Sequence, residues 1–209
     1  MSGHWHLDYH GDHALLTLDV QGQSANVLSQ EVLHELDKHL DELETKMLAG
    51  LIIRSGKASG FIAGADVREF ETIDDPARAT ELARLGQQVF ARLSGLPFAT
   101  VAVIHGYCMG GGLELALACT YRIARDDPGT RLGLPEVRLG IHPGFAGSVR
   151  LPPLVGDMAA LDMMLTGRAL SAREARRRGL VDEVQPERHL LNAAVAFLKK
   201  HPPLGKAPW

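Results

Sequence analysis

The stretch GYCMGGGLELALAC, residues 106–119, combines three consecutive glycines with one acidic residue, Glu114. The apolar run VAVIH before it predicts a buried strand, and LELALAC predicts a helix. The first backbone amides of a helix have no partner within the helix, and the helix dipole is positive at that end. Glycines let a ligand approach these amides because no Cβ atom stands in the way. The stretch is therefore suited to bind an oxygen that carries negative charge.

Two phosphate-binding motifs are absent from this stretch, which argues against a phosphate oxygen as the ligand. Leu115 occupies the position of the last glycine in the GxGxxG dinucleotide motif, and no GKS or GKT follows as in a P-loop. What remains is an amide pocket for an oxygen that gains charge during a reaction, with Glu114 about one helical turn away. The alternative is that the glycines only permit close packing and that Glu114 faces water near a dipole it stabilises. From this stretch alone, both interpretations stay open.

Two other stretches favour the catalytic interpretation. FIAGAD, residues 61–66, is a second glycine-containing loop after a strand and can supply a second amide to the same oxygen. LGLPEVRLGIHPGFAG, residues 132–147, places Glu136 in an otherwise apolar segment, where burial would raise its pKa. A carboxyl group that stays protonated can donate a proton to a substrate. The sequence thus offers two amides and two carboxyl groups as candidate chemistry.

Composition limits the class of protein that can carry this chemistry. The chain has 209 residues, 45% hydrophobic and 22% charged, which suits one globular domain. Its formal net charge of -3 provides no positive field for nucleic acid, so we expect no nucleic-acid partner. No apolar stretch of about 18 residues predicts a membrane span. Two cysteines without a CxxC pair, and an N-terminus without an apolar signal segment, favour a cytoplasmic protein.

Strands and helices alternate along the chain, which predicts an α/β domain with crossover connections. A hairpin with HGDH as its turn comes first; the expected strand segments are 4–9, 14–20, 51–53, 101–105, 121–125 and 180–184. Helices are expected to begin at the N-caps Ser29, Asp75 and Ser171. The first helix should bury Val32, Leu33, Leu36, Leu40, Leu43 and Met47. Residues 55–66 and 131–147 are expected to be loops.

Several residues of reactive type have simpler explanations. The N-terminal hairpin carries four histidines, interpreted as a solvated strand face rather than as metal ligands: His4, His6, His10 and His13. Cys108 has no partner base in its motif and is interpreted as a packing residue. His105 and His142 are interpreted as histidines with satisfied hydrogen bonds. The arginine run within 173–178 is interpreted as a solvated helix face. We therefore predict no metal site.

Four segments together resemble a known family. KASGFIAGADVREF, VAVIHGYCMGGGLELALACTYRIA, LGLPEVRLGIHPGFAGSVRLPPLVG and LTGRALSAREARRRGLVDEV are similar to the successive signatures of the enoyl-CoA hydratase, or crotonase, family. The resemblance extends from about Leu15 to Val184, and the motifs are specific when found in this order. The similarity is greatest to the N-terminal hydratase part of the multifunctional fatty-acid oxidation complex alpha subunit, in which a 3-hydroxyacyl-CoA dehydrogenase follows. It implies the α/β crotonase (ClpP-like) fold, a spiral of ββα repeats.

The resemblance also implies roles for individual residues. The two amides that bind the thioester oxygen, forming the oxyanion hole, match Ala65 and Gly111. The two catalytic acids of the hydratases match Glu114 and Glu136, of which Glu114 is expected to activate water and Glu136 to exchange the proton at the α-carbon. Coenzyme A or substrate is expected to pass the following residues: Ala63, Asp66, Val67, Gly110, Pro135 and Gly144. Ala146 stands where the family often has a further glycine.

The activity implied by the resemblance is hydration of trans-2-enoyl-CoA to 3-hydroxyacyl-CoA in fatty-acid β-oxidation. One alternative is an isomerase that moves the double bond between the Δ3 and Δ2 positions, or other thioester-enolate chemistry. An alternative of another class is a domain that binds coenzyme A esters without turnover. Hydration requires no cofactor, with the coenzyme A thioester as substrate; NAD is expected only if a dehydrogenase domain follows.

The expected organisation is one crotonase-like domain over residues 1–200, followed at 201–209 by the start of a linker. KKHPPLGKAPW favours a linker because of its prolines. Relatives that act alone continue into C-terminal helices, which this chain is expected to lack. The partners implied are acyl-CoA and either further copies of the chain or, in a longer protein, a thiolase-containing complex.

Overall fold

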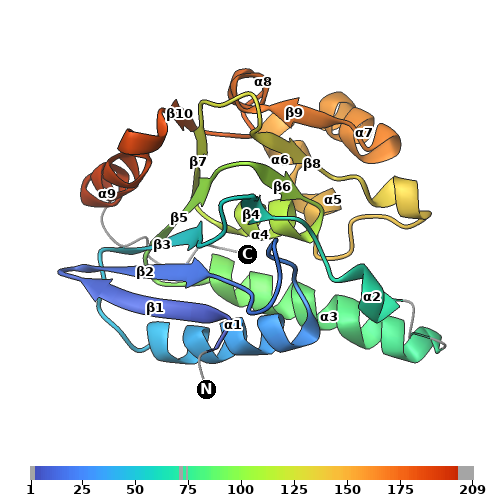
Figure 1. The fold of residues 1–209 in the computed structure, drawn as a ribbon, viewed down its shortest axis with the longest axis horizontal. Coiled ribbons are helices and arrows are strands. Elements are labelled where there is room, and N and C mark those ends of the chain that lie inside the picture. Colours follow the sequence, from blue (N-terminus) through green and yellow to red (C-terminus); the bar gives the residue numbers. More distant parts are fainter. Residues whose placement is uncertain (1–2, 71–72, 74, 202–209) are drawn as a thin grey trace.

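The computed structural model describes residues 3–70, 73 and 75–201, whose strands form two sheets (Figure 1). The larger sheet has the order β1-β2-β3-β5-β7-β10, and the smaller has the order β4-β6-β8-β9. The larger comprises β1 Trp5–His10, β2 His13–Leu18, β3 Gly50–Ser55, β5 Ala99–Ile104, β7 Tyr121–Arg125 and β10 Glu183–Gln185. The smaller comprises β4 Gly60–Ile62, β6 Tyr107–Met109, β8 Arg131–Gly133 and β9 Ala169–Ser171.

From β3 to β8, successive strands alternate between the two sheets. β3, β5 and β7 pair in parallel in the larger sheet, and each is followed by a short strand of the smaller sheet, β4, β6 and β8. The helices are α1 Gln30–Leu43, α2 Val67–Phe70, α3 Pro76–Ser94, α4 Gly111–Ala118, α5 Gly147–Arg150, α6 Pro152–Val155, α7 Asp157–Thr166, α8 Ala172–Arg177 and α9 Leu190–Lys200. Two 3-10 helices are η1 Glu136–Leu139 and η2 Glu187–His189. The predicted spiral of ββα units is confirmed.

The larger sheet is covered on both faces, as the apolar strand at 101–105 predicted. Val101 and Val103 of β5 pack with Leu190 and Leu198 of α9 on one face. Ala102 and Ile104 point to the other face, into the main core with α1, α3 and α4. In Figure 1, α9 lies apart from α1 and α3, which run side by side below the sheet. This alternation explains why β5 is buried at every position.

The predicted helix starts are confirmed by their caps. The Ser29 side chain accepts a hydrogen bond from Val32 N, Asp75 accepts one from Ala77 N, and Ser171 accepts one from Glu174 N. Each side chain satisfies a backbone amide that the helix itself leaves unpaired.

Three predictions of local structure were wrong. Met47 is fully exposed because α1 ends at Leu43, one turn earlier than the apolar pattern suggested. The expected loop 55–66 contains strand β4, which is too short for an alternating pattern to identify. The glycines 110–112 follow β6 rather than the strand at 101–105, because the chain crosses into the smaller sheet before α4 begins.

Element boundaries also differ from the prediction elsewhere. His10 pairs with His13, so only Gly11 and Asp12 form the hairpin turn. The segment 131–147 contains β8 and η1, and α7 and α9 were not predicted. The linker predicted at 201–209 lies almost wholly outside the described residues, and its first residue follows α9 directly.

Asn26 ties the first sheet to the loops that approach the glycines. Its side chain is buried; Oδ1 accepts from Val20 N at 2.9 Å, and Nδ2 lies 2.9 Å from Leu18 O and 3.1 Å from Phe61 O. Its backbone oxygen accepts from Ala63 N at 2.8 Å. One side chain therefore links the end of β2 to β4.

Replacing Asn26→Ala should lower the free energy of unfolding by about 2–4 kcal/mol, because several buried backbone groups lose their partner. The measurement is urea unfolding followed by circular dichroism. Asn192→Ala is the matched control, since Asn192 is exposed on α9 and should change stability by less than about 0.5 kcal/mol. Equal stability of the two variants would contradict the role of Asn26.

Candidate active site

The junction between β6 and α4 brings together the two glycine loops and Glu136. Gly110 has φ 51° and ψ −127°, and its amide donates to Gly133 O at 2.9 Å. A Cβ atom on Gly110 would lie 2.9 Å from Glu136 Oε1 and 3.8 Å from Gly64 Cα. Only glycine combines this backbone conformation with an open space at that point. The Gly110 amide already donates to Gly133 O, so it is not available to a substrate. The absence of a side chain on Gly110 keeps the space beside Glu136 open.

The two amides predicted to bind an oxygen are free of other partners. Ala65 forms an isolated parallel bridge with Leu28, in which Leu28 N donates to Gly64 O and Asp66 N donates to Leu28 O. This pairing uses the groups on either side of Ala65 and leaves its own N–H unused. Gly111 N lies at the start of α4, and neither amide donates to any residue that the structure describes. Both amides can therefore donate a hydrogen bond to an external oxygen.

Glu114 is a buried carboxyl group with one oxygen fixed in place. It lies in the first turn of α4 with 2% of its surface exposed, and its Oε1 accepts from Phe145 N at 2.8 Å and from Gly147 N at 2.7 Å. The pKa of Glu114 is raised to about 7: burial is the largest cause and the charge of Glu136 adds to it, whereas the amides of Gly147 and Phe145 act in the opposite direction. Because both amides use Oε1, the second oxygen stays available for a water molecule or substrate.

Glu136 is the second candidate acid, and it begins η1. Its Oε2 is buried and has no hydrogen-bond partner among the described residues. Burial raises the pKa of Glu136 as the sequence predicted, while its own backbone amide and His142 act in the opposite direction. Since an unpartnered buried carboxylate is costly, this side chain favours the protonated form or a ligand that hydrogen-bonds to it.

The remaining predicted substrate residues divide into two groups. Ala63 and Val67 are exposed on the loop that carries Ala65, where a ligand can reach them. Asp66 is buried and bonded to Arg68, whose guanidinium lowers the pKa of Asp66. The Asp66 carboxylate is therefore already paired with a cation.

Pro135 and Gly144 act on the backbone around the two acids. Pro135 precedes η1 and so sets the direction in which Glu136 enters it. Gly144 O accepts from Gln87 Nε2 at 2.8 Å. Ala146, the predicted departure from glycine, has φ 75°, a left-handed conformation that costs a non-glycine residue about 1 kcal/mol or more.

Hydrogen bonds and burial describe the surroundings of the other reactive side chains. His105 Nε2 lies 2.7 Å from Lys57 O, and His142 Nδ1 lies 3.1 Å from Pro143 O. Cys108 is fully buried, and burial raises the pKa of its thiol far above the usual value. Arg173 is exposed and pairs with Asp126. Within the described part of the chain, no three His, Cys, Asp or Glu side chains are placed to hold a metal ion.

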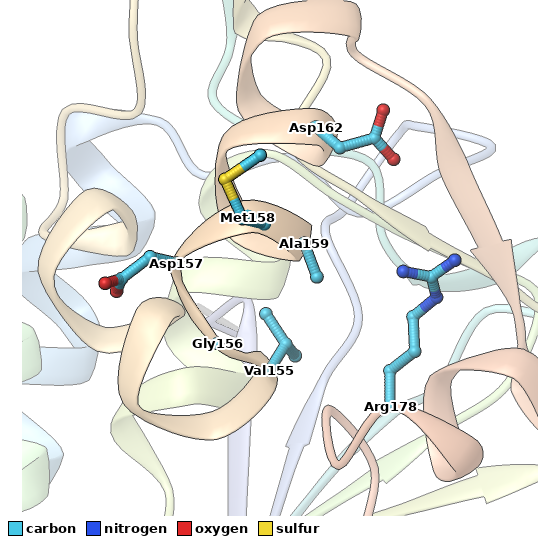
Figure 2. Close-up of a pocket in the computed structure, with 7 residues that line it drawn as sticks. All are labelled: Val155, Gly156, Asp157, Met158, Ala159, Asp162 and Arg178. Atoms are coloured by element: carbon cyan, nitrogen blue, oxygen red, sulfur yellow. The ribbon is translucent and has the colours of Figure 1, made fainter.

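A surface pocket of about 610 Å³ lies away from these residues (Figure 2). It is lined by the start of α7, the residues before it and Arg178, and Asp162 and Arg178 both extend beside it. None of the predicted site residues lines this pocket. Its volume therefore gives no reason to place the chemistry there.

Sequence reasoning missed the residues that hold Glu114. The amides of Phe145 and Gly147 fix its carboxyl group, and a Cβ on Gly147 would lie 2.8 Å from Glu114 Cγ. The two glycines of PGFAG could have indicated that the backbone of this segment closely approaches another group, here the Glu114 side chain. Nothing in the sequence indicated that Gln87 of α3 would anchor the same segment.

The fold is an α/β fold of the crotonase type, in which the strands from β3 to β8 alternate between two sheets. The family model described as "Enoyl-CoA hydratase/isomerase" matches residues 13–203. The chain therefore belongs to the enoyl-CoA hydratase/isomerase family, whose members act on coenzyme A thioesters.

Solved structures agree with this family. The chain is similar to Pseudomonas aeruginosa DspI, with 34% identity, a TM-score of 0.88, and coverage of 95% of this chain and 74% of that chain. An enoyl-CoA hydratase from Bacillus anthracis has 32% identity and a TM-score of 0.86 over 94% of this chain and 76% of that chain. An enoyl-CoA hydratase from Thermoplasma volcanium has 31% identity and a TM-score of 0.88 over 96% and 79%, respectively.

Hydropathy of the helices adds one structural finding. Among the helices in the described residues, none is both long enough and apolar enough to cross a membrane.

The raised pKa of Glu114 should make stability depend on pH. The folded state holds the Glu114 proton to a higher pH than the unfolded chain does, so its contribution is full below about pH 4 and is lost as the pH rises through 7. Glu114→Gln keeps an oxygen for both amides and removes this loss. We expect the variant to exceed the wild type by about 3 kcal/mol at pH 8 and by little at pH 4.

Urea unfolding at a series of pH values measures this difference. The exposed Glu187 supplies the control, because Glu187→Gln should follow the wild type at every pH. A pH-independent difference between Glu114→Gln and the wild type would contradict the raised pKa.

Proposed function

We propose that the chain hydrates 2-enoyl-CoA thioesters to 3-hydroxyacyl-CoA. The observation that carries the proposal is the buried carboxyl group of Glu114 together with the buried Oε2 of Glu136, near a Gly111 amide that has no partner among the described residues. The amides of Ala65 and Gly111 would receive the thioester oxygen. Similarity to the hydratases from Bacillus anthracis and Thermoplasma volcanium supports this substrate class.

The reaction needs a place for negative charge. Water adds to the β-carbon, the electrons of the double bond move toward the carbonyl, and the thioester oxygen becomes an enolate oxygen. Two backbone amides and the positive end of α4 can stabilise that oxygen by several kcal/mol when water is excluded. Because these donors are fixed before the reaction, they need no rearrangement as the charge develops.

The two carboxyl groups can divide the proton transfers. Glu114, with Oε1 held by two amides, uses its other oxygen to orient the water and takes the proton that the water loses. Glu136, whose pKa is raised by burial, gives its proton to the α-carbon. Because the charge of Glu136 raises the pKa of Glu114, the state with one of the two carboxyl groups ionised is favoured over the state with both ionised. That state has the one base and one acid that hydration requires.

Isomerisation is the second candidate, and the unpartnered Oε2 of Glu136 favours it. A single base at this position can remove a proton from one carbon of a 3-enoyl thioester and return it to another. No water takes part, so Glu114 is dispensable in this reaction. A domain that binds coenzyme A esters without turnover is the outcome if both reactions are absent.

Hydration of crotonyl-CoA, followed by the loss of enoyl-thioester absorbance, tests the proposal. Glu114→Gln and Glu136→Gln should each lower kcat by about 10² to 10⁴-fold, because each removes one proton-transfer group. Glu187→Gln makes the same chemical change at an exposed glutamate and should keep wild-type activity.

The alternatives give different results in the same assay series. Hydration that persists in both glutamine variants would contradict the proposed roles. Isomerisation of a 3-enoyl-CoA that survives Glu114→Gln, in a protein without hydration, would identify the isomerase. Binding of a coenzyme A ester without either reaction would identify a non-catalytic domain.

A further inference from the structure

Helix α3 holds the segment that positions Glu114, although it contributes no residue to the predicted site. Gln87 Nε2 donates to Gly144 O at 2.8 Å. The Phe145 ring meets the Phe90 ring edge to face, with centroids 5.6 Å apart and an angle of 86° between planes. Arg150 Nη2 donates to Ser94 Oγ at 3.0 Å. The segment 144–150 is thus fixed along α3, which runs beside α4 (Figure 1).

At Gly86, the packing of α3 against Phe145 leaves no space for a side chain. Gly86 is buried in the middle of α3, where glycine is less favourable than alanine for helix formation. A Cβ atom on Gly86 would lie 2.3 Å from Phe145 Cδ1 and 2.5 Å from Cε1. The glycine is therefore explained by the Phe145 ring, which occupies the place of a side chain.

The Phe145 ring has little freedom to move away from Gly86. On its other side, a Cβ on Gly111 would lie 3.2 Å from Phe145 Cδ2 and Cε2, so the ring fills the space between α3 and the start of α4. The backbone amide of Phe145 donates to Glu114 Oε1. Any shift of the ring is consequently passed to the hydrogen bond that orients the carboxyl group.

We propose that Gly86 and Gln87 are positioning residues for Glu114, acting through Phe145 and Gly144. This inference rests on the proposed function, because Glu114 is taken to hold the attacking water. Gly86 provides the space that the Phe145 ring requires, and Gln87 holds the backbone just before that ring. Together they keep two amides aimed at one carboxylate oxygen.

Gly86→Ala tests the proposal in the full chain. We expect kcat for crotonyl-CoA hydration to fall by about 100-fold with KM nearly unchanged, because displacement of a catalytic group by about 1 Å has an effect of this size. The pKa of Glu114 should rise, since the amide of Phe145 lowers it in the wild type. Gly95→Ala is the matched control: it adds a Cβ at the end of the same helix, where the nearest atoms lie at 3.4 and 3.5 Å. It should leave kcat unchanged.

A second substitution separates positioning from a general loss of structure. Gly86→Ala combined with Phe145→Leu should recover kcat at least tenfold over Gly86→Ala alone, because the smaller side chain makes room for the added methyl group. If the two substitutions instead act independently, so that their separate effects on kcat multiply in the double variant, the proposal is overturned. If Gly86→Ala does not fold, Gln87→Ala decides: Gln87 is exposed, so its loss should lower kcat several-fold while stability changes little. An unchanged kcat in Gln87→Ala would overturn the proposal in that case.

The two levels of inference fail in different ways. A wild type without hydration contradicts the proposed function. A wild type that hydrates, together with Gly86→Ala at the same kcat and with the same pH profile, contradicts only the positioning role of α3. The pKa of Glu114, measured by nuclear magnetic resonance of labelled glutamate, reports the arrangement without any turnover.

Discussion

The arrangement of the candidate site depends on one interaction, the two backbone amides that donate to Glu114 Oε1. A buried carboxylate is costly unless hydrogen bonds compensate for lost hydration. The amides of Phe145 and Gly147 provide that compensation at 2.8 and 2.7 Å, and they leave the second carboxyl oxygen unused. Because Gly147 has no Cβ, its backbone can approach closely enough to do so. These two hydrogen bonds therefore stabilise the charged form of Glu114 and fix the orientation of its carboxyl group.

The spiral fold brings the partners of this interaction together from distant parts of the sequence. β3, β5 and β7 of the larger sheet are each followed by a short strand of the smaller sheet, and the segments directly after β4, β6 and β8 carry Ala65, Gly111 and Glu136. Gly110 lies where these loops meet, with open space between Glu136 and Gly64. The scaffold thus presents two amides without partners among the described residues, together with two acids, at one junction.

The sequence predicted best those features that depend on the types of residues close together in the chain. The alternation of elements, the helix caps and the raised pKa of Glu136 all follow from local patterns. Sequence reasoning failed for β4, because three residues are too few to show an alternating pattern. It also failed for Met47, because the apolar pattern of the first helix continues beyond the residue at which the helix ends. It also could not identify Gln87, because a side chain that acts on a distant backbone oxygen leaves no pattern of its own.

The measurement that tests the central claim most directly is the fate of crotonyl-CoA incubated with the chain in water labelled with oxygen-18. The account predicts a 3-hydroxyacyl-CoA product that carries one labelled oxygen at the β-carbon, seen by mass spectrometry, because a water held by Glu114 adds there. A product of unchanged mass with a shifted double bond, or no product, would contradict the claim that the two carboxyl groups serve the addition of water.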